Sequence, residues 1–167
     1  MKPSGFTLFE LLITLSVLSV TLSIAVPQLR DSLVQAEVDS TSQQLLASIN
    51  RTRHEAIKRN TFVVMSARGK WENGWEIFED RNQNAALDAG EAVLFTYAKQ
   101  SKIKIQGNNI LSSYIGYGST GRSRQASGAF LAGSLLICGT RRTKKVVVNA
   151  GGRIRVDGIQ GIECADN

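Results

Sequence analysis

Hydrophobic residues form one long, nearly continuous run at the start of the chain. The run extends from Phe6 to Val26 and contains one ionisable residue, Glu10. As a helix, this segment reaches roughly 30 Å, about the thickness of the hydrocarbon core of a membrane. A carboxylate within lipid costs roughly 2.5–3.5 kcal/mol, so an intramembrane glutamate indicates a function. The sequence therefore predicts a transmembrane helix over residues 6–26 with a functional Glu10.

After Pro27 the pattern remains helical but becomes amphipathic. Apolar residues recur at helical spacing on an otherwise polar segment: Leu29, Leu33, Leu45, Ile49 and Ile57. Such a stripe is typical of a helix that packs against a sheet. Residues 27–60 are therefore predicted to continue the first helix into a globular domain, and Asn60 and Thr61 to end it.

From Phe62 onwards the apolar pattern changes to a period of two, which is typical of strands. Clusters of glycine and asparagine separate these segments, as hairpin loops require. The predicted strands are Phe62–Ala67, Gly74–Glu79, Ala92–Ala98, Lys102–Gln106, Ile110–Tyr117, Phe130–Cys138, Lys144–Asn149 and Gly152–Val156. Because their connections are short, the sheet is expected to be mostly antiparallel. One helix followed by strands alone predicts an α+β fold, with residues 61–167 as a β-rich domain.

Composition and charge indicate the size of the domain and the type of partner it binds. The chain has 167 residues, 43% of them hydrophobic, which allows one membrane helix and one modest domain. Its formal net charge is +6, and the charges are unevenly distributed. Residues 71–91 include six acidic side chains and one arginine, whereas residues 117–156 include eight lysines or arginines and no acidic residue. This asymmetry predicts a polyanion-binding surface in the C-terminal part.

The position of Gly5 distinguishes this N-terminus from an ordinary secretory signal. A secretory signal is cut after its apolar stretch, which is then lost. A cut between Gly5 and Phe6 instead leaves the stretch on the mature protein. The new α-amine then lies near Glu10 and is its natural counter-ion, in the same subunit or a neighbouring one. The alternatives are a plain signal anchor and a secretory signal cleaved after Ala25.

The sequence G-F-T-L-F-E, followed by an apolar helix, resembles the class III signal of type IV pilins and type II secretion pseudopilins. The resemblance implies that a prepilin peptidase removes residues 1–5 as a leader, cutting after Gly5, and methylates Phe6. It also implies that Glu10 assists the docking of subunits into a filament whose core contains residues 6–26. Pro27 falls where pilin helices usually kink. The fold expected from the resemblance is pilin-like, with the long N-terminal helix packed on an antiparallel sheet.

The sharpest candidate for a binding site is the stretch G-G-R-I-R at residues 151–155. On a strand, Arg153 and Arg155 project from one face, roughly 6.5–7 Å apart, while Ile154 points into the core. The preceding glycines allow a tight turn and leave the backbone accessible to a large ligand. Guanidinium groups suit phosphate oxygens because their donors form a planar fork. Basic residues expected to enlarge this region are Arg141, Arg142, Lys144 and Lys145, joined by Arg122 and Arg124 from a glycine-rich loop.

The strand order, residues 71–80 and the late glycine-bracketed strand resemble the FimT/GspH group of minor pilins and pseudopilins. In the FimT branch, a G-R-x-R motif near the C-terminus is associated with DNA binding in natural transformation, and Gly152, Arg153 and Arg155 match it. The basic part has no visible base-reading element. Binding to double-stranded DNA is therefore expected to involve phosphates, to be independent of sequence and to weaken with salt. The alternative is a solvated basic strand that aids solubility or pairs with acidic neighbours in a filament.

A second candidate site is the acidic segment 80–91, DRNQNAALDAGE. Its oxygen-bearing side chains stand nearly at the ligand spacing of an EF-hand calcium loop, at Asp80, Asn82, Asn84, Asp88 and Glu91. However, Ala85 replaces the glycine of the sharp turn, and the flanking segments are predicted strands. The favoured interpretation is a polar loop that joins two strands.

Two cysteines, Cys138 and Cys164, suggest a disulfide if the domain is exported, with two buried free thiols as the alternative. The single histidine, His54, is predicted to be a surface residue of the helix. No nucleophile–base–acid arrangement, phosphate-binding loop or dinucleotide motif is recognisable, so neither an enzyme nor a cofactor is predicted.

These features together predict a minor type IV pilin of the FimT kind. Before assembly it is held in the inner membrane with its C-terminal domain in the periplasm. It then joins other major and minor pilins in an extracellular pilus that binds DNA for uptake. The alternatives are a structural minor pseudopilin of type II secretion, similar to GspH, and a pilus adhesin for acidic polymers or surfaces.

Overall fold

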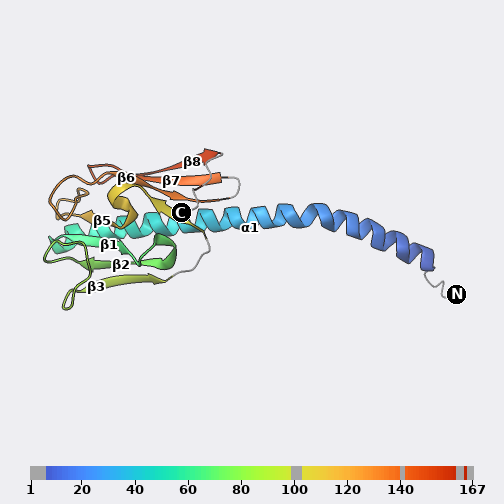
Figure 1. Cartoon of the computed structure of the whole chain (residues 1–167), viewed down its shortest axis with the longest axis horizontal. Coiled ribbons are helices and arrows are strands. Elements are labelled where there is room, and N and C mark those ends of the chain that lie inside the picture. The colour runs from blue at the N-terminus through green and yellow to red at the C-terminus, as the bar shows by residue number, and fades with distance from the viewer. Residues whose placement is uncertain (1–6, 99–102, 140–141, 161–163, 165–167) are drawn as a thin grey trace.

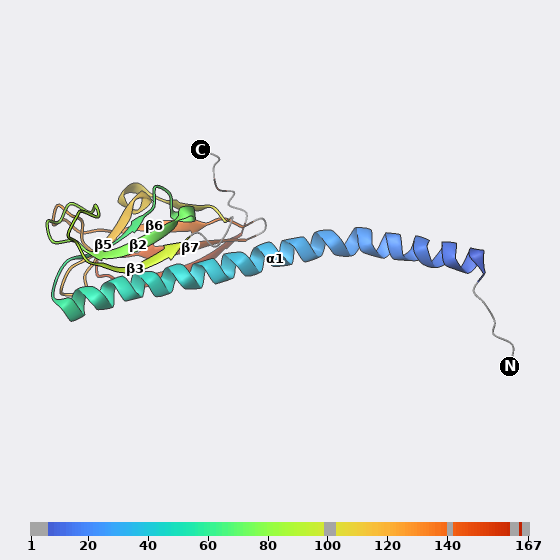
Figure 2. The same cartoon turned by 90° about the horizontal axis from the view of Figure 1, so that it is seen from below.

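The computed structural model describes residues 7–98, 103–139, 142–160 and 164. In this part of the chain, one long helix, α1 (Leu8–Arg59), precedes eight strands. The N-terminal part of α1 projects far beyond the strands (Figure 1). Figure 2 shows its C-terminal half lying along one side of both sheets. The predicted α+β class, with a long N-terminal helix packed on antiparallel strands, is therefore confirmed.

The projecting part of α1 has the properties of a membrane segment. Residues 7–30 are all exposed, and α1 is the one helix in the described part that is long and apolar enough to cross a membrane. Pro27 lies inside the helix, where it removes one backbone hydrogen bond. The helix curves in this N-terminal part (Figure 1). It ends where predicted, at Asn60, whose left-handed φ of 52° stops the helical repeat.

The buried face of α1 begins later than the sequence predicts. The structure buries Leu45 and Ile49 of the predicted apolar stripe, together with Val38. The other three members of the stripe are exposed: Leu29, Leu33 and Ile57. The sheets cover α1 only beyond about Val38, which leaves Leu29 and Leu33 exposed, whereas Ile57 is 47% exposed near the other end of the helix. The regular apolar repeat in the sequence therefore did not reveal where burial begins or ends.

The strands form two four-stranded antiparallel sheets, where the sequence predicted one. The first sheet has the order β3-β2-β1-β5 and contains β1 (Val63–Ala67), β2 (Gly74–Glu79), β3 (Val93–Ala98) and β5 (Tyr114–Tyr117). The second has the order β4-β6-β7-β8 and contains β4 (Ile105–Gly107), β6 (Gly133–Ile137), β7 (Arg142–Val148) and β8 (Ile154–Gln160). Helix α1 packs against strands of both sheets, and the larger of the two hydrophobic clusters among the described residues lies between these three elements.

Two strands, β5 and β8, have bounds that differ from the prediction for identifiable reasons. Residues Asn109–Ser112 form a short 3₁₀ helix, so β5 begins at Tyr114. This turn buries Leu111, whose carbonyl accepts a hydrogen bond of 2.7 Å from the indole Nε1 of Trp71. The last strand, β8, begins after the predicted start because residues 149–152 form a turn, and it continues to Gln160 because it pairs with all of β7.

Candidate nucleic-acid interface

The G-R-x-R motif lies at the start of β8, in the last hairpin of the fold. β8 is an edge strand, hydrogen-bonded to β7 alone among the described strands. The register pairs Val148 with Ile154 beside the turn and Arg142 with Gln160 at the other end. With a rise of about 3.3 Å per residue, the ends of the hairpin lie about 20 Å apart. The basic residues are therefore distributed along a strand pair and not gathered in one cluster.

The turn before β8 depends on Gly152. Its N–H donates to the carbonyl of Asn149 at 2.8 Å, and its φ of 80° lies in the left-handed region that favours glycine. A Cβ atom on Gly152 would lie 2.2 Å from the carbonyl oxygen of Gly121 and 3.1 Å from the Tyr117 ring. Gly152 is buried, which corrects the expectation that its backbone is open to a ligand. Its role is to seat the hairpin tightly on the preceding loop.

Arg153 and Arg155 are both exposed, as the sequence predicts. Ile154 between them is half-buried and packs on the core. The N–H of Arg153 donates to the side chain of Asn149 at 2.9 Å, so its backbone is fixed immediately before β8 and not within the strand. Its guanidinium has no ion pair in the described part of the chain. Arg155 differs, because its Nε lies 3.0 Å from a carboxylate oxygen of Asp157.

Lys144 and Arg142 lie toward α1 and away from the outer surface of the hairpin. The Lys144 ammonium group lies 2.8 Å from a carboxylate oxygen of Asp39 in α1 and donates a hydrogen bond to it. This charged hydrogen bond holds the pKa of Asp39 below its usual range. Arg142 lines a hollow with Asp31 and Gln35 of the same helix. Successive strand residues point to opposite faces, so these two side chains do not share a face with Lys145. Their assignment to one continuous basic surface is therefore corrected.

We call Lys145, Arg153, Arg155 and Asp157 the outer strip. Lys145 is paired directly across the strands with Asp157, so the two side chains share a face. The sequence analysis missed Asp157 because this residue comes directly after the acid-free interval, residues 117–156. The sequence also gave no signal for Asp39, since it lies about 100 residues before its partner. Arg141 was predicted to belong to the basic region but lies outside the described residues.

The two arginines of the glycine-rich loop have different environments. Arg122 is exposed and has no ion pair within the residues that the structure describes. Arg124 is half-buried, donates a hydrogen bond to the side-chain oxygen of Gln83, and lies over the ring of Phe62 at 5.5 Å from its centroid. Arg122 is therefore available to a ligand, whereas Arg124 has a packing role.

The acidic segment 80–91 forms the connection between β2 and β3. The carboxylate of Asp80 is 1% exposed and accepts hydrogen bonds from two backbone N–H groups of the loop. The side-chain amides of Asn82 and Asn84 donate to Asp88 and lower its pKa, and Glu91 accepts from the backbone of Asp88. Among the described residues, no group of three or more acidic, histidine or cysteine side chains is placed to hold a metal. Local hydrogen bonding thus supports the interpretation as a polar loop.

At the other end of the molecule, Glu10 forms a capping box with Thr7. The Glu10 carboxylate accepts from the Thr7 backbone N–H at 2.9 Å, and the Thr7 hydroxyl accepts from the Glu10 N–H at 3.2 Å. This arrangement satisfies two of the free donors at the start of a helix. Glu10 therefore has a local structural partner in the uncleaved chain. Gly5 and Phe6, the predicted processing residues, lie outside the described residues.

Cys138 and Cys164 form the predicted disulfide, with Cα atoms 5.9 Å apart. Cys138 follows β6 directly, and its N–H donates to the carbonyl of Lys104. The bond therefore ties the segment after β8 to the inner part of the second sheet. It encloses the whole β7–β8 hairpin, including the outer strip.

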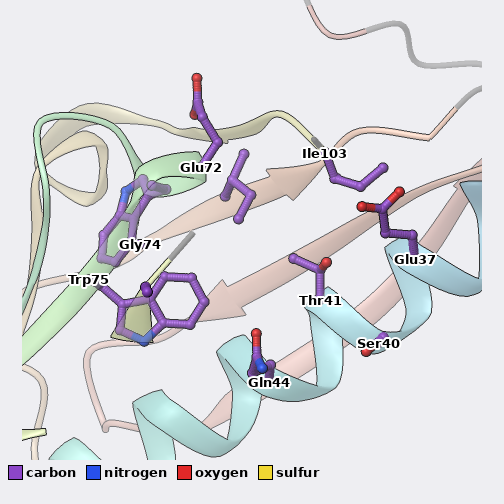
Figure 3. A pocket seen from close by; sticks show the side chains of 11 residues that line it. Glu37, Ser40, Thr41, Gln44, Glu72, Gly74, Trp75 and Ile103 are labelled. Atoms are coloured by element: carbon purple, nitrogen blue, oxygen red, sulfur yellow. The ribbon is translucent and has the colours of Figure 1, made fainter. Parts of the chain in front are cut away.

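A cavity of about 110 Å³ lies between α1 and the edges of both sheets. Figure 3 shows Glu37, Thr41 and Gln44 of α1 on one side and Trp75 on the other. Trp75 is 4% exposed, and its indole Nε1 has no hydrogen-bond partner in the described part of the chain. His54 is exposed on α1 and is not among the residues that line this cavity. No catalytic role follows from these side chains.

Two sequence families match the chain. Residues 41–152 match the family described as Type II transport protein GspH. Residues 1–26 match the Prokaryotic N-terminal methylation motif. The chain is also similar to the Pilin-like protein PilA1 of Thermus thermophilus, with 28% identity over 160 residues, which cover 94% of this chain and 100% of the relative.

Solved structures show the same fold. Crystal structures of the type IV minor pilin FimU of Pseudomonas aeruginosa, in two crystal forms, match with TM-scores of 0.57 and 0.54 at 15% identity. The better match covers 74% of this chain and 90% of FimU. Together with the GspH match over most of the globular part, this shows that the chain belongs to the GspH family of type IV pilin-like proteins and carries their N-terminal methylation motif.

Proposed function

We propose that this protein is a minor type IV pilin of the FimT kind that binds extracellular double-stranded DNA for uptake in natural transformation. In this proposal α1 holds the protein in the inner membrane, with the C-terminal domain in the periplasm, until assembly. Prepilin peptidase cuts after Gly5 and methylates Phe6. Contacts with other pilins then place the second sheet on the outside of an extracellular pilus.

The observation that carries the proposal is the environment of Arg153. Its backbone is fixed by Asn149, its side chain is exposed, and it has no counter-ion in the described part of the chain. Arg155 lies on the edge strand β8 itself, with 73% of its side chain exposed. Exposed guanidinium groups on a hydrogen-bonded backbone suit phosphate oxygens, and an edge strand at the surface leaves room for a duplex.

Such a site makes few phosphate contacts and reads no bases. We therefore expect one subunit to bind DNA weakly, with a dissociation constant of about 10⁻⁴–10⁻⁶ M at physiological salt. Several copies in one filament would raise the avidity if their sites engage the same duplex. The Arg155–Asp157 pair reduces the net charge of the outer strip, which supports an affinity at the weaker end of this range.

Replacing Arg153 and Arg155 with glutamine should abolish DNA binding without changing thermal stability, because both side chains are exposed and make no core contact. The measurement is a titration of a labelled duplex with the full chain in detergent micelles at several salt concentrations. The matched control is Arg68→Gln with Lys70→Gln, which removes the same charge from exposed positions after β1. DNA binding by the Arg153/Arg155 variant equal to that of the control would refute the proposed site.

A second candidate function is that of a structural minor pseudopilin of type II secretion. It is favoured by the ion pairs Lys144–Asp39 and Arg155–Asp157, which neutralise two basic residues within the chain itself. Absence of duplex binding by the wild-type chain, even in dilute buffer, would favour this function. An adhesin for acidic polymers relies on the same basic residues and would bind such polymers in preference to DNA.

Glu10 offers a separate test of filament assembly. Glutamine at this position preserves a capping box but removes the charge, whereas alanine removes both. If docking requires a carboxylate, Glu10→Gln and Glu10→Ala should both prevent incorporation into pili, as measured by immunoblotting of sheared filaments. Normal incorporation of Glu10→Gln would show that the residue acts only as a helix cap.

A further inference from the structure

Three segments that are distant in sequence meet at the end of the molecule farthest from the N-terminus. They are the last turns of α1, the Gly118–Arg122 turn and the turn before β8. A Cβ atom on Gly121 would lie 2.8 Å from the Ile57 side chain and 3.2 Å from Nε of Arg53. A Cβ atom on Gly152 would in turn lie 2.2 Å from the Gly121 carbonyl. Figure 1 shows the C-terminal end of α1 and the β7–β8 turn at this end.

Each of the three segments contributes basic side chains. Arg53 and Lys58 come from α1, Arg122 follows Gly121, and Arg153 follows Gly152. From the close approach of Gly121 to Gly152 and standard backbone dimensions, the Cα atoms of Arg122 and Arg153 lie within about 10 Å of each other. We call these four residues the distal tip.

The basic groups of the distal tip have few internal charge interactions, and the one attraction to a carboxylate in the described part of the chain is that of Lys58, which helps to lower the pKa of Glu55. None of the four has an ion pair within the residues that the structure describes, and Nε of Arg53 is buried without a hydrogen-bond partner. The nearby carboxylates of Glu55 and Glu79 are both paired with Arg59, at 2.7 and 3.9 Å. A group of cations without ion-pair partners at a protein surface attracts a polyanion, because an anion supplies the missing interactions.

We infer that the distal tip is a second phosphate-contacting surface, so that DNA passes from the outer strip over the tip onto the end of α1. This inference rests on the proposed function and adds two helix residues, Arg53 and Lys58, to the site. Duplex DNA carries a charge about every 1.7 Å along its axis, so a backbone that contacts Arg153 also passes near Arg122. The tip lies at the opposite end from the apolar part of α1, so the bilayer does not compete for it (Figure 2).

The test is a pair of exposed substitutions, Lys58→Gln with Arg122→Gln, in the full chain in detergent micelles. Loss of two phosphate contacts should reduce the slope of log affinity against log salt by about 1.8. Between 50 and 200 mM salt, wild-type affinity should then fall about twelve-fold more than that of the variant. The control pair Arg68→Gln with Lys70→Gln should keep the wild-type slope.

Arg53→Gln gives an independent measurement. Added to the Lys58/Arg122 variant, it should reduce the slope of log affinity against log salt further. Because Arg53 is half-buried, the melting temperature of the Arg53→Gln variant is measured as well. If this temperature falls, the inference is judged from the Lys58/Arg122 variant alone. A wild-type slope for that pair, together with loss of binding in the Arg153/Arg155 variant, would overturn this inference and leave the proposed function intact. If the Lys58/Arg122 variant and the Arg153/Arg155 variant both keep the wild-type slope, both this inference and the proposed function are overturned.

Discussion

Replacing Gly152 with alanine is expected to lower the free energy of unfolding by roughly 2–4 kcal/mol, because it adds a left-handed non-glycine residue and a steric overlap. The φ of 80° disfavours any residue with a Cβ atom. That atom would also lie 2.2 Å from the backbone carbonyl oxygen of Gly121, which cannot move without shifting the loop. The melting temperature should fall by roughly 10 °C, since each kcal/mol corresponds to a few degrees in a domain of this size.

Gly151→Ala is the matched control for this substitution. Gly151 is exposed, and an added Cβ atom would meet only the Asn149 side chain, at 3.4 Å. Unfolding can be followed by intrinsic fluorescence, because both tryptophans, Trp71 and Trp75, are buried in the globular part. Equal melting temperatures for the Gly151 and Gly152 variants would contradict the packing described here.

The Gly152 substitution also separates the roles of the glycine and the arginines in the G-R-x-R motif. The glycine is buried at the hairpin turn, while the two arginines are exposed. A Gly152 variant should therefore lose DNA binding together with stability, because the turn that carries Arg153 moves. The Arg153/Arg155 variant should lose binding alone. A comparison of the two separates the structural part of the motif from the part that contacts the ligand.

Local patterns in the sequence were sufficient to predict the long helix and the approximate positions of the strands, but not the 3₁₀ helix at Asn109–Ser112 or how the elements pack together. The continuous apolar run and the stop at Asn60 fixed the helix, because both are properties of adjacent residues. The division into two sheets depends on which strands pair: β5 pairs with β1 in the first sheet and β4 pairs with β6 in the second, and these partners are distant in sequence. Likewise, Ala85 adopts a left-handed φ of 61°, so alanine did not exclude the turn that glycine normally makes there.

The candidate site shows the same division between local and distant effects. The exposure of Arg155 follows from strand alternation after Ile154, and Arg153 is exposed although it precedes the strand. The ion pair between Lys144 and Asp39, which removes Lys144 from the basic surface, could not be predicted. Predicting it requires knowing which face of β7 packs against which turn of α1. The contribution of Arg53 was hidden for the same reason. Charge counted along a sequence interval therefore overestimated the basic surface on β7 and missed the one at the distal tip.

The disulfide provides the second large expected effect. Replacing Cys138 and Cys164 with serine removes a cross-link between residues 26 positions apart. In the chain-entropy estimate, closing a loop of this size stabilises the folded state by about 3.5 kcal/mol, through restriction of the unfolded chain. The melting temperature of the full chain should therefore fall by roughly 10 °C.

A reducing agent supplies the internal control for this prediction. It should lower the melting temperature of the wild-type chain to that of the Cys138→Ser, Cys164→Ser variant and leave the variant itself unchanged. DNA binding well below the melting temperature should persist in the variant, because β7 remains hydrogen-bonded to both β6 and β8. If the reduced protein instead lost DNA binding while still folded, the disulfide would act on the outer strip directly and not through the stability of the sheet.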